Sequence, residues 1–299
     1  MIREKRTKSG KLLEVDFYPI WNDGRRMPSR SPKTNKSTAE QAKYNKKQAT
    51  KKLIRLINTN FDETDIIMHP TYAPAKAPLT EEQARRDVTS YLRRVKYRRE
   101  KELKIVEQQI SALSDDKSLD DIREGLKLRL KKLKAPFKYI YVTEKVTYKS
   151  GKLKGRDNWH FHLFVTGGLS RKTLESMWGN GMRANADSYQ PDRFGPDAIA
   201  KYMSKDPAGA KRFCCSRNLE KPQTPPPKDG CITAQGVERI AKFRPDDKDY
   251  WERRYKGYKF LKCYARYNEY NGHWYVTAVM YKTSSAPPRW EMDDWLDAD

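Results

Sequence analysis

Two histidines placed two positions apart are the residues whose spacing most clearly favours chemistry. They lie in Trp159-His160-Phe161-His162-Leu163, which predicts a strand. Because side chains alternate between the two faces of a strand, His160 and His162 point the same way, and Phe161 points into a core. Two imidazoles in this arrangement can bind one divalent metal ion. The chain has only four histidines among 299 residues, so the pair is unusual, and chance is the alternative explanation.

A third metal ligand is expected on the strand that precedes the histidines. Residues 137–148 and 159–165 are β-rich and flank a turn, so they predict a hairpin. A turn centred near Lys152 places Glu144 across from His160, on the face of both histidines. A carboxylate suits Mg²⁺ or Mn²⁺, and the two imidazoles shift the site toward Mn²⁺. His69, on an earlier strand, is the rival third ligand, and an ion pair of Glu144 with a lysine is the alternative without a metal.

A tyrosine and a lysine on a later segment form the second candidate group. Residues 195–205 predict a helix with Pro196 in its first turn. Tyr202 and Lys205 are three positions apart, so they share one face of that helix. A nearby cation or a metal-bound phosphate favours the phenolate form of Tyr202, and Lys205 can stabilise charge in a phosphoryl-transfer transition state. The spacing alone is common in a chain with 18 tyrosines.

The charge of the chain indicates a polyanionic partner. Its 62 Lys and Arg residues against 39 Asp and Glu residues give a formal charge of +23, and nucleic acid is the expected partner. We expect DNA contacts from basic residues in and after the predicted helix, namely Lys201, Arg212, Arg217 and Lys221.

Other sequence features limit the class of protein. No apolar run has membrane-spanning length and the N-terminus lacks a signal-peptide core, so we expect a cytoplasmic protein with no membrane partner. No GxxxxGK[ST] phosphate loop is present, so a helicase would come from the host. Three cysteines within eighteen residues leave a zinc site as the alternative to ordinary reduced thiols; the four cysteines are Cys214, Cys215, Cys231 and Cys263.

The remaining pattern predicts the elements that must position these groups. Residues 65–72 predict a strand, and Thr80 opens a helix with an apolar face made by Ala84, Val88, Tyr91, Leu92 and Val95. Residues 97–134 predict a charged helical hairpin, which either embraces DNA or is a solvated insertion. Residues 169–178 predict a short helix and residues 182–189 a strand. Asn271-Gly272 predicts a second hairpin, within residues 258–281.

We therefore expect three regions. Residues 1–54 predict a basic N-terminal arm, either lying along DNA or a solvated tail, because residues 1–60 hold sixteen Lys and Arg against five acidic residues. Residues 55–222 form the catalytic domain, which contains the helical hairpin. Residues 223–299 form an aromatic and basic C-terminal extension, whose rings suit either base stacking or a core.

The ordered set of these motifs resembles the HUH endonuclease superfamily, in particular rolling-circle replication initiators of bacterial plasmids and phages. The resemblance covers residues 55–222. It rests on the His-hydrophobic-His strand at His160 and His162, the preceding Glu144, and the later Tyr202-Met203-Ser204-Lys205. The segment Arg217–Pro222 is also similar to one in initiators of Gram-positive bacteria. The strand at residues 66–72 departs from the family's hydrophobic-Thr pattern.

The resemblance implies an α+β fold with a central antiparallel sheet of about five strands flanked by helices. It also implies a metal-dependent endonuclease that nicks single-stranded or hairpin origin DNA. The metal polarises the scissile phosphate, Tyr202 forms a 5′-phosphotyrosine bond, and the released 3′-hydroxyl primes a host polymerase. With one tyrosine on the helix, a single-tyrosine enzyme is expected.

Three alternatives are open. A transposase or relaxase would use the same residues on another DNA target. A non-catalytic basic DNA-binding protein would use the histidines as structural residues. A metal-dependent nuclease that uses water as its nucleophile would cut without a covalent adduct.

Overall fold

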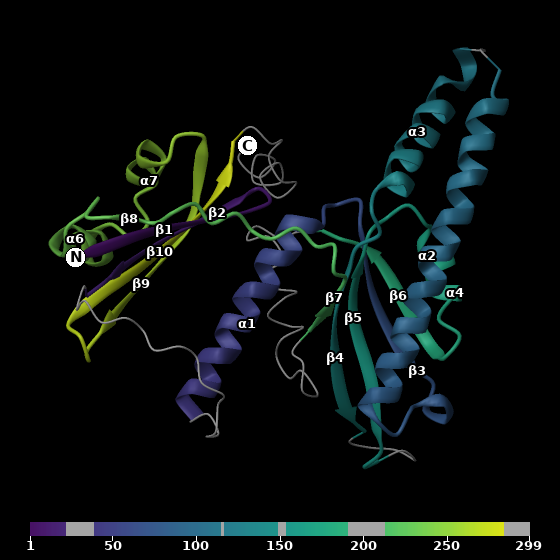
Figure 1. The fold of residues 1–299 in the computed structure, drawn as a ribbon, viewed down its shortest axis with the longest axis horizontal. Helices are drawn as coiled ribbons and strands as arrows, with labels where there is room; N and C mark the ends of the chain where they lie inside the picture. The colour runs from purple at the N-terminus through teal and green to yellow at the C-terminus, as the bar shows by residue number, and fades with distance from the viewer. Residues whose placement is uncertain (22–38, 115–116, 149–153, 191–212, 284–299) are drawn as a thin grey trace, which may run out of the picture. The chain divides into compact units, whose positions relative to one another are not determined.

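The computed structural model describes residues 1–21, 39–114, 117–148, 154–190 and 213–283 (Figure 1). The chain divides into two compact units. We call them the terminal unit, from the described residues of Met1–Thr59 and Glu220–Asp299, and the central unit, from those of Asn60–Pro191 and Ala198–Leu219. Each unit has its own five-stranded antiparallel sheet and its own hydrophobic core, and each is described by itself.

The sheet of the central unit confirms the predicted α+β fold with about five strands flanked by helices. Its strand order is β6-β3-β5-β4-β7, and all of its pairings are antiparallel. The predicted strands at residues 65–72, 137–148, 159–165 and 182–189 are all present. The bounds are β3 (Ile66–Tyr72), β4 (Tyr139–Thr147), β5 (Asp157–Val165), β6 (Gly181–Ser188) and β7 (Cys214–Cys215).

Helices cover one face of this sheet. The Thr80 side chain caps the long helix α2 by accepting a hydrogen bond from the Gln83 amide, as its sequence predicts. The apolar face of α2 is buried against Met68, Tyr72 and Phe161 of the sheet. The helical elements of this unit are η1 (Pro74–Lys76), α2 (Glu81–Ala112), η2 (Lys117–Leu119), α3 (Asp120–Lys134) and α4 (Arg171–Ser176).

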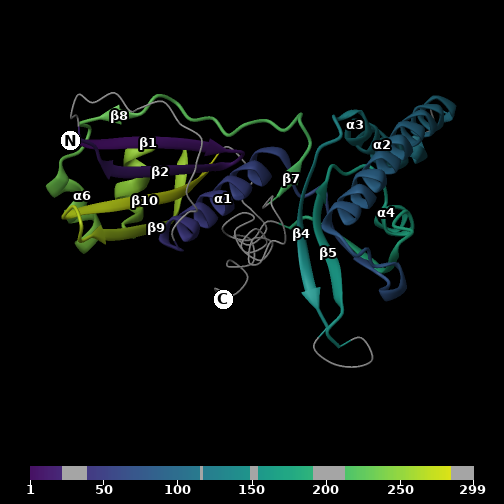
Figure 2. The same ribbon diagram turned by 60° about the horizontal axis from the view of Figure 1, so that its bottom comes forward.

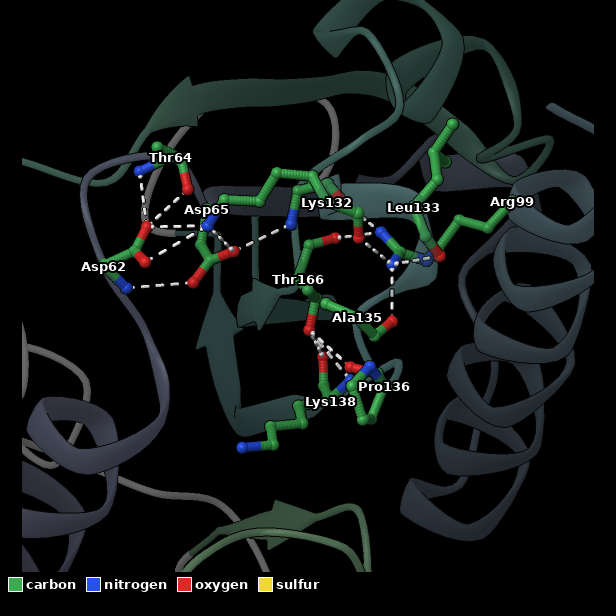
Figure 3. Close-up of polar contacts among 11 residues, drawn as sticks. Asp62, Thr64, Asp65, Arg99, Lys132, Leu133, Ala135, Pro136, Lys138 and Thr166 are labelled. Atoms are coloured by element: carbon green, nitrogen blue, oxygen red, sulfur yellow. Dashed lines mark hydrogen bonds and ion pairs between the residues drawn. The ribbon is translucent and has the colours of Figure 1, made fainter. Parts of the chain in front are cut away.

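A buried arginine joins the helical hairpin of α2 and α3 to the sheet. Arg99 is 3% exposed, and its guanidinium donates hydrogen bonds to backbone carbonyls at the end of α3 and after β5 (Figure 3). The acceptors include Lys132 at 2.8 Å, Ala135 at 3.1 Å and Thr166 at 3.0 Å, together with Gly167 and Leu133. The planar fork of an arginine can satisfy several carbonyls at once. The predicted helical pair is therefore present and is anchored at its base.

The sequence predicted a basic arm for residues 1–54, but the described part of this segment is folded into the terminal unit. Its sheet has the order β8-β1-β2-β10-β9, so strand β2 of the N-terminal hairpin pairs with β10, more than 250 residues later in the chain (Figure 2). The elements are β1 (Ile2–Ser9), β2 (Leu12–Pro19), α1 (Ala39–Asn60), β8 (Lys228–Asp229), α6 (Ala234–Phe243), α7 (Lys248–Arg254), β9 (Tyr258–Asn268) and β10 (His273–Lys282).

The N-terminal hairpin folds because residues far along the chain supply its core partners. Leu13, Val15 and Phe17 alternate along β2 and are buried against α6, α7 and β10. Trp251 of α7 is completely buried and stacks on Phe17 with ring centroids 6.2 Å apart. The apolar partners of the N-terminal hairpin thus come from the region predicted as a C-terminal extension, and residues 1–59 and 220–299 form one unit rather than two flanking segments.

The second predicted hairpin is present. Strands β9 and β10 pair around the Asn271-Gly272 turn, with His273 opposite Asn268. Gly272 has φ +66°, a left-handed conformation that glycine adopts without strain. Among the described residues, we find no helix with both the length and the apolar character needed to cross a membrane.

Candidate functional site

Five polar side chains lie together on the sheet face of the central unit opposite α2. They come from three neighbouring strands: His69 and Thr71 from β3, His160 and His162 from β5, and Glu144 from β4. Thr71 and Glu144 each lie directly across from His160, one on either side of β5. The register predicted for the Glu144–His160 pair is therefore confirmed, and we call His69, Glu144, His160 and His162 the histidine cluster.

The ring of His162 makes two side-chain contacts in opposite directions. Its Nδ1 lies 3.0 Å from Nδ1 of His69, and its Nε2 lies 3.0 Å from Oε2 of Glu144. The rings of His69 and His162 meet edge to face, with centroids 5.1 Å apart. Glu144 reaches His162 diagonally across the strands, which is within the range of a long side chain.

The ring of His160 is held in a similar way. Its Nδ1 lies 3.1 Å from the hydroxyl of Thr71 on β3. Both β5 histidines therefore place Nδ1 against a β3 side chain. Metal-binding histidines commonly pair one ring nitrogen with such an orienting group and ligate through the other nitrogen. This arrangement would leave Nε2 of His160 and of His162 as the nitrogens that could ligate a metal ion.

Burial favours neutral imidazoles at this site. His162 is 5% exposed, and His69 and His160 are partly buried. Burial lowers the pKa of His69 below its ordinary value of 6.5, and the neighbouring His162 and His160 lower it further against the opposing effect of Asp187. Burial also lowers the pKa of His160, more than Glu144 raises it. A neutral imidazole is the form that binds metal ions.

The chemistry of the donors fits a divalent ion, although the side chains contact each other in pairs. Among the residues that the structure describes, no group of three or more His, Cys, Asp or Glu side chains is arranged to hold a metal ion. The 3.0 Å separation of His162 Nε2 and Glu144 Oε2 equals the spacing of adjacent ligands on an octahedral ion with bonds of about 2.1 Å.

A cleft opens beside His69 on the same face. Its volume is about 510 Å³, and its lining includes Arg171, Asp187 and Gln190 with Ile67, His69 and Ser188. Asp187 lies 3.9 Å from the Arg171 guanidinium. The cleft provides room and a cationic side chain next to the histidine cluster. Neither Arg171 nor Asp187 was a sequence candidate. Asp187 reaches the site because β6 pairs with β3, and Arg171 reaches it because α4 contacts β6.

The other candidate residues have separate outcomes. Tyr202, Lys205, Lys201 and Arg212 lie outside the described residues. Arg217 is exposed in the central unit, and Lys221 is exposed in the terminal unit. None of the four cysteines, all within the described residues, forms a disulfide: Cys214 and Cys215 form β7 of the central unit, whereas Cys231 and Cys263 belong to the terminal unit.

Thr71 is the contact that sequence reasoning missed. A lone threonine on a strand carries no local signal, and its role appears only when β3 is aligned with β5, where Thr71 faces His160.

In comparisons with known proteins, no protein-family model, curated protein or solved structure matches the chain.

Proposed function

We propose that the chain is a metal-dependent endonuclease that nicks single-stranded DNA through Tyr202 and starts rolling-circle replication. The observation that carries the proposal is the meeting of His160, His162 and Glu144 on one sheet face, with Nδ1 of both histidines held by β3. The formal charge of +23 supports a nucleic-acid substrate. The resemblance of the ordered motifs to HUH endonucleases supports the same reaction class.

The histidine cluster would hold Mg²⁺ or Mn²⁺ through His160, His162 and Glu144. When bound, the metal supplies a Lewis acid that polarises the scissile phosphate. His69 and Thr71 would orient the two imidazoles by occupying Nδ1 of each. A neutral His69 can accept a hydrogen bond from His162, which agrees with its lowered pKa. We therefore propose Glu144 rather than His69 as the third ligand.

The reaction is a transesterification at phosphorus. The Tyr202 hydroxyl loses its proton, and its oxygen forms a bond to the scissile phosphorus. The bond from phosphorus to the 3′-oxygen breaks, and that oxygen takes up a proton to become a 3′-hydroxyl. The 5′-phosphate stays on Tyr202, so the bond energy is kept for rejoining. Lys205 stabilises the charge on the transferring phosphate.

The substrate would be a single-stranded or hairpin replication origin. Arg171, in the cleft beside His69, would contact a phosphate next to the scissile one, and Arg217, Lys221, Lys201 and Arg212 would add positive charge along the strand. The released 3′-hydroxyl would prime a host polymerase, and a host helicase would unwind the template.

The test is formation of a covalent protein–DNA adduct. The protein is incubated in Mn²⁺ with single-stranded DNA from the element that encodes it and is then run on a denaturing gel. The wild type is expected to cut and to form the adduct, and Tyr202→Phe is expected to bind DNA with unchanged affinity and form none. Tyr44→Phe is the matched control, because Tyr44 is an exposed tyrosine on α1 and should leave the adduct intact.

A non-catalytic DNA-binding protein is the second candidate, and one observation favours it. Both ring nitrogens of His162 already have side-chain partners, as expected for a histidine with a structural role. That candidate predicts no cleavage of any origin strand in Mn²⁺. Cleavage without an adduct, retained in Tyr202→Phe, would instead indicate water as the nucleophile.

A further inference from the structure

The outer strand pair of the terminal unit carries cations and aromatic rings in alternation on one face. Along β9, Lys262, Tyr264 and Arg266 are two positions apart, so their side chains share a face. Tyr275 of β10 lies directly across from Arg266 and joins that face. We call Lys262, Tyr264, Arg266 and Tyr275 the aromatic–basic face.

This face is opposite to the core of the unit. Core residues Phe260, Val276 and Ala278 occupy the other side of the same two strands and pack under α6 and α7. Tyr264 is 52% exposed, although a large aromatic ring usually gains by burial. Arg266 is also exposed, and Tyr275 is half-buried. The rings therefore lie on the face of the sheet that points away from the core, because other side chains of the same strands form that core.

Cations lie over the rings of this face. Nζ of Lys262 is 5.3 Å from the centre of the Tyr264 ring, and the Arg266 guanidinium is 5.5 Å from the centre of the Tyr275 ring. The Tyr275 hydroxyl accepts a hydrogen bond of 2.8 Å from Asn271 in the turn, which orients its ring. A nucleic-acid strand needs both features, a π face for each base and a cation for each phosphate.

Two carboxylates of β2, Glu14 and Asp16, lie on the same sheet face, and both pair with basic residues of α1. Asp16 of β2 faces Thr277, which in turn faces Tyr264. The Asp16 carboxylate accepts a 2.7 Å hydrogen bond from Thr277 and pairs with Lys51 of α1 at 3.3 Å. Because these carboxylates are paired, the cations Lys262 and Arg266 of the face suit a polyanionic partner.

We propose that the aromatic–basic face binds single-stranded DNA by stacking bases on Tyr264 and Tyr275, with Lys262 and Arg266 contacting phosphates. Single strands suit this face because their bases are free to stack, whereas the bases of a duplex are paired inside the helix. The choice of DNA over RNA rests on the proposed function. The face would be a second DNA contact in a unit separate from the histidine cluster, and it would hold a strand whether or not the strand is cut.

The experiment uses the full chain in EDTA, so that binding is read without cleavage. Oligo(dT) with one 5-iodouracil is cross-linked by ultraviolet light, and the modified peptide is mapped by mass spectrometry. The cross-link is expected on Tyr264 or Tyr275. Tyr264→Ala should weaken oligo(dT) binding about tenfold, as expected for the loss of one base–aromatic stack, and Tyr264→Phe should bind like the wild type.

Tyr97→Ala is the matched control. Tyr97 is 60% exposed on α2 and has the Lys101 ammonium 4.8 Å from its ring centre, so it reproduces an exposed tyrosine under a cation outside this face. An equal affinity of Tyr264→Ala and Tyr97→Ala, with no cross-link in β9 or β10, would overturn the proposal. Tighter binding of an oligoribonucleotide or a duplex would overturn the choice of partner. All of these readouts are independent of nicking by Tyr202.

Discussion

Glu144 lies directly across the hairpin from His160, but its carboxylate contacts His162, with Oε2 3.0 Å from Nε2 of that ring. The diagonal contact leaves Nδ1 of His162 to His69 and Nδ1 of His160 to Thr71. Strand β3 thus supplies the orienting partners, and strand β4 supplies the carboxylate. In the proposed metal site, Glu144 is therefore a ligand, whereas His69 and Thr71 orient the imidazoles.

Removal of Glu144 should weaken metal binding more than removal of His69. Glu144→Ala deletes a proposed ligand, so we expect Mn²⁺ affinity to fall by about a hundredfold, whereas His69→Ala deletes an orienting partner and should cost about tenfold. Isothermal titration with Mn²⁺ measures both. His273→Ala, which removes the histidine of the terminal unit, should leave the affinity unchanged. A larger loss in His69→Ala would make His69 the ligand and Glu144 its support.

Arg99 should be a major determinant of the stability of the central unit. Arg99→Ala leaves buried carbonyls of the α3 end and the β5 end without a donor, so we expect a loss of about 3 kcal/mol or more in the free energy of unfolding. Urea unfolding, with hydrogen exchange at residues 166–170, measures the change. The neighbouring Arg98→Ala breaks only a partly exposed pair with Glu102 and should cost under about 1 kcal/mol. Equal losses of stability in Arg99→Ala and Arg98→Ala would show that the buried Arg99 guanidinium contributes no more than a surface ion pair.

The terminal unit should lose stability in acid through Glu14. Burial raises the pKa of this carboxyl, but the hydrogen bond from Arg55 and the charges of Lys51 and Arg55 outweigh burial and hold the pKa below its ordinary value of 4.5. A carboxyl with a lowered folded-state pKa stabilises the fold fully above its unfolded pKa, and the contribution disappears as the pH falls through the folded value.

Glu14→Gln should therefore be less stable than the wild type at pH 7 and should lose less on acidification to pH 3. Urea unfolding, followed by hydrogen exchange in β2, measures the slope. Glu82→Gln is the control, because Glu82 pairs with Arg86 on the exposed surface of α2. Parallel slopes for the wild type and Glu14→Gln would show that this carboxyl does not set the acid limit.

The sequence predicted those features of the fold that depend on residues close to one another along the chain. The Glu144–His160 register follows from a short hairpin, and the cap at Thr80 and the turn at Asn271-Gly272 are likewise set by neighbouring residues. These features need no knowledge of the rest of the chain. The α+β fold with a sheet of about five strands was instead what the resemblance of the ordered motifs implied.

Long-range pairing explains what the sequence did not reveal. The hairpin of β1 and β2 is rich in charge, and its burial depends on β10 and on Trp251, which lie far along the chain. The contacts of His69 and Thr71 depend on a register between β3 and β5, which no short turn connects. Composition therefore indicated an arm where the folded chain has two strands of a five-stranded sheet.

The most direct test of the account is to locate the nucleotide on the protein. After incubation with a single-stranded origin in Mn²⁺, the protein is digested with trypsin and nuclease, and its peptides are examined by mass spectrometry. The account predicts a 5′-phosphonucleotide on Tyr202, absent in EDTA and in His162→Ala. A nucleotide on another residue, or cleaved DNA with every tyrosine unmodified, would contradict it.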